Sequence, residues 1–257
     1  MSARSSLFPE APTGRRRQEG MPASPAWPPP SALVTGAAGG IGRAIVERLE
    51  QEGADVTGLD VKDGFDVTDS AAWESVGRFE LACLNAGVTT GTASIAELTD
   101  EEYRRVVAVN VDGVLFGVRR LVGVMGDGDA IVVTASLAGL TGVESDPIYA
   151  LTKHAVIGLV RSVAPQLAQS GIRINAVCPG FADTAMVTGE FRSALESAGF
   201  PLLRAEEVAE AVLIAARSEG TGEAWIVQPG RRPEPYRFRG IPGPRVPGAE
   251  GIAPPPL

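Results

Sequence analysis

From residue 32 onward, short apolar runs alternate with stretches that carry apolar residues at helical spacing. The runs have the length and composition of buried strands, and the stretches are typical of amphipathic helices. Strands that alternate with helices pair in parallel through right-handed crossovers. The sequence therefore predicts an α/β fold, a single doubly wound domain with a mostly parallel sheet and helices on both faces. In such sheets, ligands bind beyond the carboxyl ends of the strands.

The expected elements follow one another regularly along the chain. Strands are expected at residues 32–35, 54–59, 81–84, 130–134, 173–177 and 224–228. Helices are expected at residues 41–51, 99–123, 149–168 and 206–216. Thr99 or Asp100 is the expected N-cap of the second helix, because Glu101 and Glu102 suit a first helical turn. The segment between the second and third strands has room for only one short helix, near residues 70–79.

The prolines divide the chain into one folded block and two tails. Seven of the 20 prolines lie in residues 1–30 and nine in residues 229–257, which leaves four for the block between them. We expect a disordered tail at residues 1–30, one folded domain at residues 31–228 and a basic, proline-rich tail at residues 229–257. Met21 is an alternative start to Met1. The C-terminal tail either is solvated or docks on an acidic surface through Tyr236, Phe238 and Ile241.

Charge and composition exclude several classes of partner. The net charge is −8 although both tails are basic, so the folded block is strongly acidic. Such a block repels nucleic-acid phosphates and anionic lipid. No run approaches the roughly 20 apolar residues of a membrane span. Cys83 and Cys178 form no disulfide framework or metal site. We therefore expect a cytoplasmic protein that binds a small molecule and neither nucleic acid, membrane nor metal.

A glycine-rich loop follows the first expected strand and opens directly into a helix. Small residues in this position let the backbone approach a pyrophosphate, which then lies against the helix N-terminus. Asp60 ends the next strand, 18 residues after Gly42. A carboxylate there accepts from an adenosine ribose and repels a 2′-phosphate, which favours NAD over NADP; Lys62 is the one cation nearby. The alternative for Asp60 is an ordinary strand-end turn residue. The candidate loop residues are Gly36, Ala38, Gly39, Gly40, Ile41 and Gly42.

Tyr149 and Lys153 are four residues apart and share one face of a helix. A phenol is a poor base at neutral pH, and a nearby ammonium and a nicotinamide cation both favour its phenolate. Tyr149 then takes the proton of an alcohol as hydride leaves to NAD. Ser136, just past a strand, is placed to hydrogen-bond the substrate oxygen. Taken singly, these residues also fit a surface pair and a helix cap.

Together, Thr-Gly-x-x-x-Gly-x-Gly, Asn85-Ala86-Gly87 and Tyr149-x-x-x-Lys153 resemble the short-chain dehydrogenase/reductase family over about residues 31–228. The resemblance implies a Rossmann fold, a homodimer or homotetramer, and four catalytic residues, the fourth being Asn110, which holds a water connecting Lys153 to solvent. It also implies that Tyr149 and Lys153 contact the cofactor. Further cofactor contacts are implied for Asp66 and Val67 at adenine, Asn85, Ala86 and Gly87 at the adenosine ribose and the sheet, and Pro179, Gly180, Ala182 and Thr184 at the nicotinamide.

The expected substrate pocket is apolar, which favours a lipophilic secondary alcohol, steroid-like or hydroxy-fatty-acid-like, and its ketone. Residues 182–200 form an expected mobile lid with glycines at 189 and 199. Two other functions are an NAD-binding regulator without turnover and a scaffold that uses its tails. The expected lining residues are Leu137, Ala138, Val143, Phe181, Met186, Val187 and Phe191.

Overall fold

The computed structural model describes residues 27–91, 94–187, 189–240, 244 and 246. Of the expected N-terminal tail, residues 1–26 lie outside this part, as does Ile241. The chain divides into two compact units, of which the larger ends at Pro235 and contains the whole sheet. In the smaller unit, the rings of Tyr236 and Phe238 meet edge to face with centroids 4.9 Å apart.

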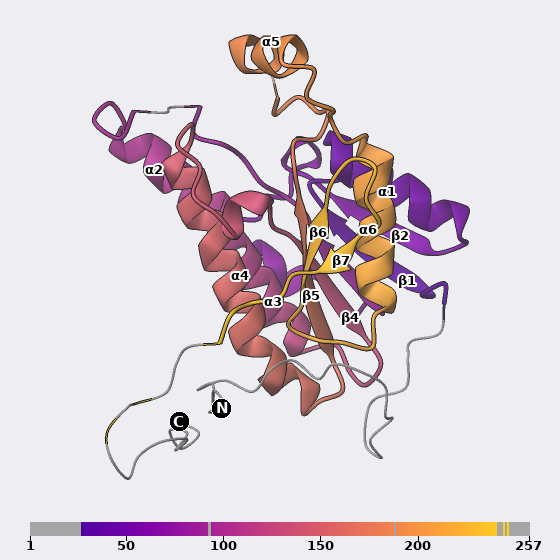
Figure 1. The fold of residues 1–257 in the computed structure, drawn as a ribbon. Helices are drawn as coiled ribbons and strands as arrows, with labels where there is room; N and C mark the ends of the chain where they lie inside the picture. Colours follow the sequence, from indigo (N-terminus) through magenta and orange to yellow (C-terminus); the bar gives the residue numbers. More distant parts are fainter. Residues whose placement is uncertain (1–26, 92–93, 188, 241–243, 245, 247–257) are drawn as a thin grey trace. The chain divides into compact units, whose positions relative to one another are not determined.

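One seven-stranded sheet forms the centre of the larger unit, in the order β2-β1-β3-β4-β5-β6-β7 (Figure 1). All neighbours pair in parallel except the last two, which are antiparallel. The direction of winding reverses between β1 and β3, which is the switch point where such sheets bind ligands. The strands are β1 (Ser31–Thr35), β2 (Asp55–Leu59), β3 (Leu81–Leu84), β4 (Ala130–Thr134), β5 (Arg173–Pro179), β6 (Ala224–Val227) and β7 (Glu234–Pro235).

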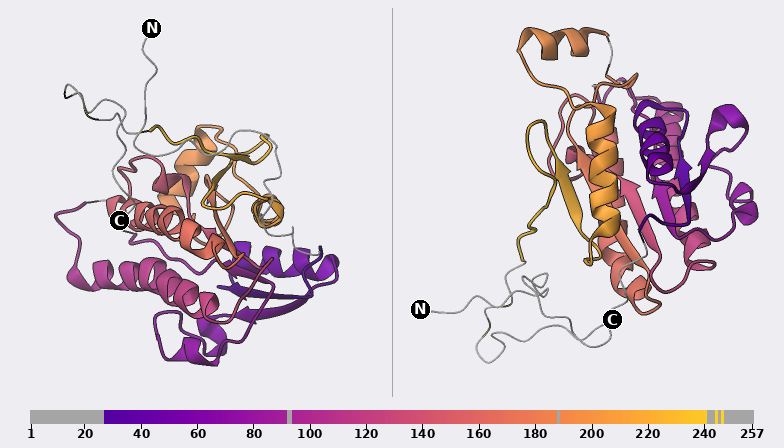
Figure 2. Two further views of the ribbon diagram at one scale, coloured as in Figure 1. Left: turned by 90° about the horizontal axis from the view of Figure 1, so that it is seen from below. Right: turned by 90° about the vertical axis from the view of Figure 1, so that its right-hand side faces the viewer.

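Helices cover both faces of the sheet, as the views in Figures 1 and 2 show. On one face, α1 (Gly40–Gln51) and α6 (Ala205–Arg217) pack against each other. On the other lie α2 (Asp100–Val107), α3 (Gly113–Val122) and α4 (Pro147–Ala168). A further helix, α5 (Gly189–Ser197), projects beyond the sheet. The expected α/β fold is therefore confirmed.

The central strands are buried because helices cover them on both sides. All residues of β3, β4 and β5 are buried. The edge strand β2 has no buried residue, since only two short 3-10 helices, η1 (Val61–Asp63) and η2 (Ala72–Ser75), join it to β3. The short connection in the sequence thus leaves one end of the sheet thinly covered.

Local signals fix the ends of the helices beside the site. Thr99 caps α2 in a capping box with Glu102, where the Thr99 hydroxyl accepts from Glu102 N at 3.2 Å. Asp146 caps α4, and Pro147 occupies its first turn, where a missing N–H costs nothing. No helix within the described ranges is both long enough and apolar enough to cross a bilayer.

Candidate active site

The glycine-rich loop between β1 and α1 is held in a shape that only glycine permits. Gly36 has a φ of +66°, and its N–H donates to the carbonyl of Leu59 at 2.8 Å. A Cβ added to Gly42 would lie 2.0 Å from the Gly36 carbonyl oxygen. Gly39 caps α1 without a side-chain hydrogen bond to the first amides of the helix. These amides and the bare backbone form a cradle that fits a pyrophosphate.

The segment after β5 lies against this loop. A Cβ added to Gly40 would come within 2.9 Å of Thr184 Cγ2. Ala182 forms an isolated bridge with Leu203, and Gly180 N donates to Val227 O at 3.0 Å. The fold therefore brings the residues expected at the pyrophosphate and those expected at the nicotinamide into contact, although they are far apart in sequence.

The Asp60 side chain accepts hydrogen bonds from the backbone around the glycine loop. Its carboxylate accepts from Ala38 N and from Lys62 N, both at 3.0 Å, and the residue is 8% exposed. These contacts tie the glycine loop to the end of β2 and cap η1. The structure thus supports the turn-residue interpretation, while contact with a ribose stays a prediction.

The expected adenine residues differ in exposure. Asp66 is exposed and caps its own turn, where its carboxylate accepts from Thr68 N at 2.9 Å. Val67 is buried, and its carbonyl accepts from the indole N–H of Trp73 at 3.0 Å. This hydrogen bond holds the segment around Val67 in place, although no α-helix lies between β2 and β3. Adenine contact by these residues stays a prediction.

Asn85 links three strands at their carboxyl ends. Its amide donates to Thr35 O at 3.2 Å, and its carbonyl accepts from the Thr134 hydroxyl at 3.1 Å. The Thr35 hydroxyl accepts from the N–H groups of Asn85 and Ala86 at 2.9 and 3.2 Å. These bonds hold the turn after β3 against β1 and β4, which matches the sheet-stabilising role implied for Asn85.

Asn110 lies in a π-helical turn, η3 (Ala108–Asp112), between α2 and α3. Its side chain is fully buried and fully bonded. The amide donates to Val88 O at 2.8 Å and to Thr152 Oγ1 at 3.0 Å, and the carbonyl accepts from Val88 N at 2.8 Å. The Thr152 hydroxyl in turn donates to Tyr149 O at 2.8 Å. Asn110 therefore joins the segment after β3 to the helix that carries Tyr149.

Lys153 points into the same region. Its ammonium donates to Thr134 O at 2.9 Å and lies 5.5 Å from the centroid of the Tyr149 ring. Both Lys153 Nζ and Asn110 Oδ1 lie 3.4 Å from the place that a Cβ on Gly87 would take. The described structure thus brings three of the four expected catalytic residues together around the turn after β3.

Ser136, the fourth, follows β4 and faces Tyr149. Its hydroxyl accepts from Ala138 N at 3.1 Å, which caps the 3-10 helix η4 (Leu137–Gly139). The same hydroxyl donates to Pro179 O at 3.5 Å, and Ser136 opposes the rise that burial causes in the pKa of Tyr149. The serine is therefore a helix cap, and its contact with a substrate oxygen stays a prediction.

Burial dominates the electrostatics of the pair. It raises the pKa of Tyr149 to about 12, with Asp146 and Cys178 adding to the rise and Ser136 opposing it. It also lowers the pKa of Lys153 to about 8. Among the protein groups alone, the loss of hydration on burial outweighs the interactions that favour the phenolate; the lower pKa expected beside both Lys153 and a nicotinamide cation stays a prediction.

The expected substrate lining is only partly at an open surface. Ala138 and Val187 are buried, whereas Phe181, Met186 and Phe191 are exposed. The ring of Phe181 meets those of Phe191 and Phe200 edge to face, with centroids 5.1 and 5.7 Å apart. These three rings, here called the aromatic cluster, come from α5 and from the segments before and after it. Of the expected lining residues, Leu137 alone also lines either of two open grooves in the described structure.

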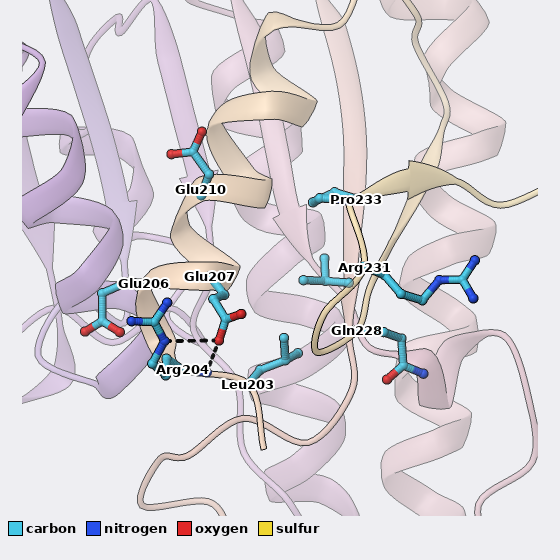
Figure 3. Close-up of a pocket in the computed structure, with 9 residues that line it drawn as sticks. Leu203, Arg204, Glu206, Glu207, Glu210, Gln228, Arg231 and Pro233 are labelled. Atoms are coloured by element: carbon cyan, nitrogen blue, oxygen red, sulfur yellow. Dashed lines mark hydrogen bonds and ion pairs between the residues drawn. The ribbon is translucent and has the colours of Figure 1, made fainter. Parts of the chain in front are cut away.

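These grooves lie at the β6–β7 end of the sheet. One, of about 430 Å³, has apolar walls from Leu137, Phe200, Pro201, Ile226 and Pro229, and carries Gln228, Arg231 and Glu234. The other, of about 270 Å³, lies between the start of α6 and the turn after β6 (Figure 3). We call the first the apolar groove. Sequence reasoning missed it because its last wall comes from residues assigned to the tail.

Two further residues at the site were also missed. Thr152 connects Asn110 to the backbone of Tyr149, and Asp146 accepts from Tyr149 N at 2.9 Å and from Thr90 N at 3.0 Å. The Asp146-Pro147 pair is a recognisable helix start and could have shown the cap. Nothing in the sequence marks Thr152, because its partner is 42 residues away.

Comparisons with known proteins agree on the kind of chemistry. A family model described as "Enoyl-(Acyl carrier protein) reductase" matches residues 59–230. The 3beta-hydroxysteroid dehydrogenase 2 of Eggerthella lenta is 33% identical over 190 residues, covering 62% of this chain and 73% of that protein. The cis-4-hydroxycyclohexanecarboxylate dehydrogenase of Sinomonas cyclohexanicum is 36% identical over 221 residues, covering 72% and 88%. The cyclohexanol dehydrogenase of an Acinetobacter species is 32% identical over 232 residues, covering 76% and 92%.

Among solved structures, the ligand-free aldohexose dehydrogenase of Thermoplasma acidophilum superimposes with a TM-score of 0.70. It is 28% identical and the match covers 79% of this chain and 97% of that one. The similarity thus extends over nearly the whole of that enzyme.

Proposed function

Because this chain belongs to the short-chain dehydrogenase/reductase family and is an oxidoreductase that acts on CH–OH groups, we propose that it oxidises a lipophilic, cyclic secondary alcohol to the ketone with NAD. The observation that carries the proposal is the meeting of Tyr149, Lys153 and Asn110 beside the glycine loop of a switch-point site. The named relatives act on hydroxysteroids and cyclic alcohols, which favours a ring over an open-chain hydroxy fatty acid.

The residues present fit a dinucleotide. The bare backbone at Gly36–Gly42 would hold its pyrophosphate, and Thr184 would hold its nicotinamide end. Asp60 supports NAD rather than NADP, because its buried carboxylate would repel a 2′-phosphate, and neither Gly39 nor Val61 supplies a cation. When bound, the oxidised nicotinamide would supply the hydride acceptor for the carbinol carbon and a positive charge that favours the Tyr149 phenolate.

In this proposal the four side chains divide the steps of proton transfer between them. Ser136 holds the substrate hydroxyl by a hydrogen bond, and Tyr149 Oη accepts its proton. Lys153, fixed by Thr134 O, favours the phenolate and passes a proton onward, with Asn110 holding the route to solvent. A regulator that binds NAD without turnover has no need of this arrangement of buried polar groups. Assembly as a homodimer or homotetramer stays a prediction.

The test is NAD-dependent turnover across cyclic secondary alcohols, with an open-chain hydroxy fatty acid plus NAD and an enoyl thioester plus NADH as alternatives. We expect oxidation of the cyclic alcohols, measured as NADH formation, with NADP a poorer acceptor. Tyr149→Phe removes the oxygen that accepts the substrate proton and should lower kcat by roughly a hundredfold to ten-thousandfold while leaving NAD binding intact. Turnover of the enoyl thioester alone, or an active Tyr149→Phe, would contradict the proposal.

A further inference from the structure

The apolar groove begins beside the catalytic serine. Leu137, which follows Ser136, forms one wall, and Ile226 and Phe200 form others. Gly180 lies between Leu137 and Gln228, since a Cβ added there would be 3.5 Å from Leu137 Cδ1 and 3.0 Å from Gln228 Oε1. Gly180, which is expected at the nicotinamide, therefore lies against two residues that line the groove. An apolar ring whose carbinol reaches Ser136 would extend along these walls.

One permanent cation lies in this groove. Arg231 ends a tight turn in which its N–H donates to Gln228 O at 3.1 Å, and Gly230 takes a φ of +71°. Pro229 and Gly230 occupy the two central positions that a type II turn favours for proline and glycine. The turn fixes the backbone from which the guanidinium extends, so the charge is anchored at the groove although the side chain itself is exposed.

Arg231 also lines the other groove, but its guanidinium points away from the acidic residues there. In Figure 3, the side chains of Arg231 and Gln228 point away from Glu206, Glu207 and Glu210 on α6. Its ion pair is with Glu234, with Arg231 Nη2 2.8 Å from Glu234 Oε1. Both side chains are more than half exposed, at 66% and 55%. An exposed pair of this kind contributes little stability, so Glu234 is readily exchanged for another carboxylate.

We infer that Arg231 selects a substrate that carries a carboxylate on the far side of its ring from the reacting hydroxyl. Guanidinium and carboxylate match as a two-pronged hydrogen-bonded pair. The apolar walls would hold the ring, and Glu234 would give up the guanidinium and turn to water. This inference rests on the proposed function, because it names the class of cyclic alcohol that the same site takes.

The experiment compares two substrates that differ in one charge, cis-4-hydroxycyclohexanecarboxylate and its primary carboxamide. We expect the wild type to prefer the carboxylate in kcat/KM. Arg231→Gln should lower kcat/KM for the carboxylate by roughly tenfold and change that for the carboxamide less than twofold. Glu234→Gln should act in the opposite direction by removing the competing carboxylate. Arg232→Gln makes the same charge change at the next residue, which lies outside both grooves. It should leave kcat/KM unchanged for both the carboxylate and the carboxamide.

A binding measurement separates this inference from the proposed function. Isothermal titration of the NAD-loaded protein with cyclohexanecarboxylate and with cyclohexanecarboxamide needs no turnover. The inference is supported if the wild type binds the carboxylate more tightly than the carboxamide and Arg231→Gln loses this preference. Equal binding of the two by the wild type, or an equal loss of both in Arg231→Gln, overturns it even when cyclic alcohols are oxidised. Preferential binding without any oxidation would leave the role of Arg231 standing and contradict the proposed function.

Discussion

The two sides of the site are held in place by different forces. On the catalytic side, Asn110, Thr152 and Lys153 are at most 4% exposed. Asn110 and Lys153 donate to the backbone of other elements, and Thr152 accepts from the Asn110 side chain. On the substrate side, Phe181, Phe191 and Phe200 are 38%, 39% and 42% exposed and meet edge to face. The helix α5, which carries Phe191, has no buried residue.

This difference suggests that the buried side of the site governs the chemical step and that the exposed side governs substrate selectivity. Buried hydrogen bonds that cross from one element to another fix positions, because breaking one leaves a polar group unsatisfied. Exposed aromatic contacts cost little to rearrange, so they adapt to the shape of a substrate. Substitutions on the catalytic side should therefore change kcat, and substitutions on the substrate side should change KM.

The largest effect is expected where the hydrogen-bonded chain to Tyr149 is broken. Thr152→Val keeps the shape of the side chain but leaves one N–H of Asn110 without its acceptor. An unsatisfied buried donor costs about 1–3 kcal/mol, so we expect kcat to fall roughly tenfold as the Tyr149 helix shifts against the segment after β3. KM for NAD should stay within twofold.

Thr152→Ser is the matched control for this prediction. It restores the hydroxyl that accepts from Asn110 and donates to Tyr149 O, so kcat should recover to within about threefold of the wild type. Thermal unfolding of both variants shows how much of the effect is general loss of stability. A Thr152→Val enzyme with normal kcat and only a lower melting temperature would show that Thr152 does not position the catalytic side.

A smaller effect is expected from the charge that caps α4. Oxidation requires the phenolate, so kcat/KM rises with pH until Tyr149 loses its proton. The negative charge of Asp146 raises the pKa of Tyr149, as does Cys178. Asp146→Asn removes the charge and keeps the oxygen that accepts from Tyr149 N. The rising limb of the pH profile should therefore move to lower pH, by roughly half a unit.

Two variants check the cause of that shift. Glu144→Gln removes an exposed carboxylate that does not act on Tyr149, so its pH profile should match the wild type. Asp146→Ala also removes the cap and should unfold more easily, by about 1 kcal/mol, with the same shift in the profile. An unmoved limb in Asp146→Asn would show that the pH dependence is not governed by Tyr149 beside Asp146.

Local patterns were enough to predict the fold, and they indicated a site whose residues the structure brings close together. The alternation of strands and helices gave the parallel sheet, and the glycine loop and the Tyr149–Lys153 spacing placed the site at its switch point. Each of these signals depends on residues close together in the sequence. The same holds for the capping box at Thr99, where donor and acceptor are three residues apart.

What the sequence did not reveal depends on distant pairing. The bond from Asn110 to Thr152 and the burial that raises the pKa of Tyr149 exist only after α2, α3 and α4 pack on one face. The apolar groove needs β7 beside β6, and a strand of two residues within a proline-rich segment gives no pattern to read. Asp60 shows the remaining difficulty, because one carboxylate suits both a turn and a ribose.

The smallest effect is expected on the substrate side, from Phe191→Ala. The variant removes the edge-to-face contact with Phe181, worth about 0.5–1.5 kcal/mol, at a site that is already 39% exposed. We expect KM for a cyclic alcohol to rise roughly threefold to tenfold, with kcat and the melting temperature nearly unchanged. Phe191→Leu retains apolar area without the ring, so its KM should lie between those of the wild type and of Phe191→Ala. If Phe191→Ala instead lowered kcat as strongly as Thr152→Val and left KM alone, the aromatic cluster would belong to the catalytic machinery, and the division between a fixed catalytic side and an adaptable substrate side would fail.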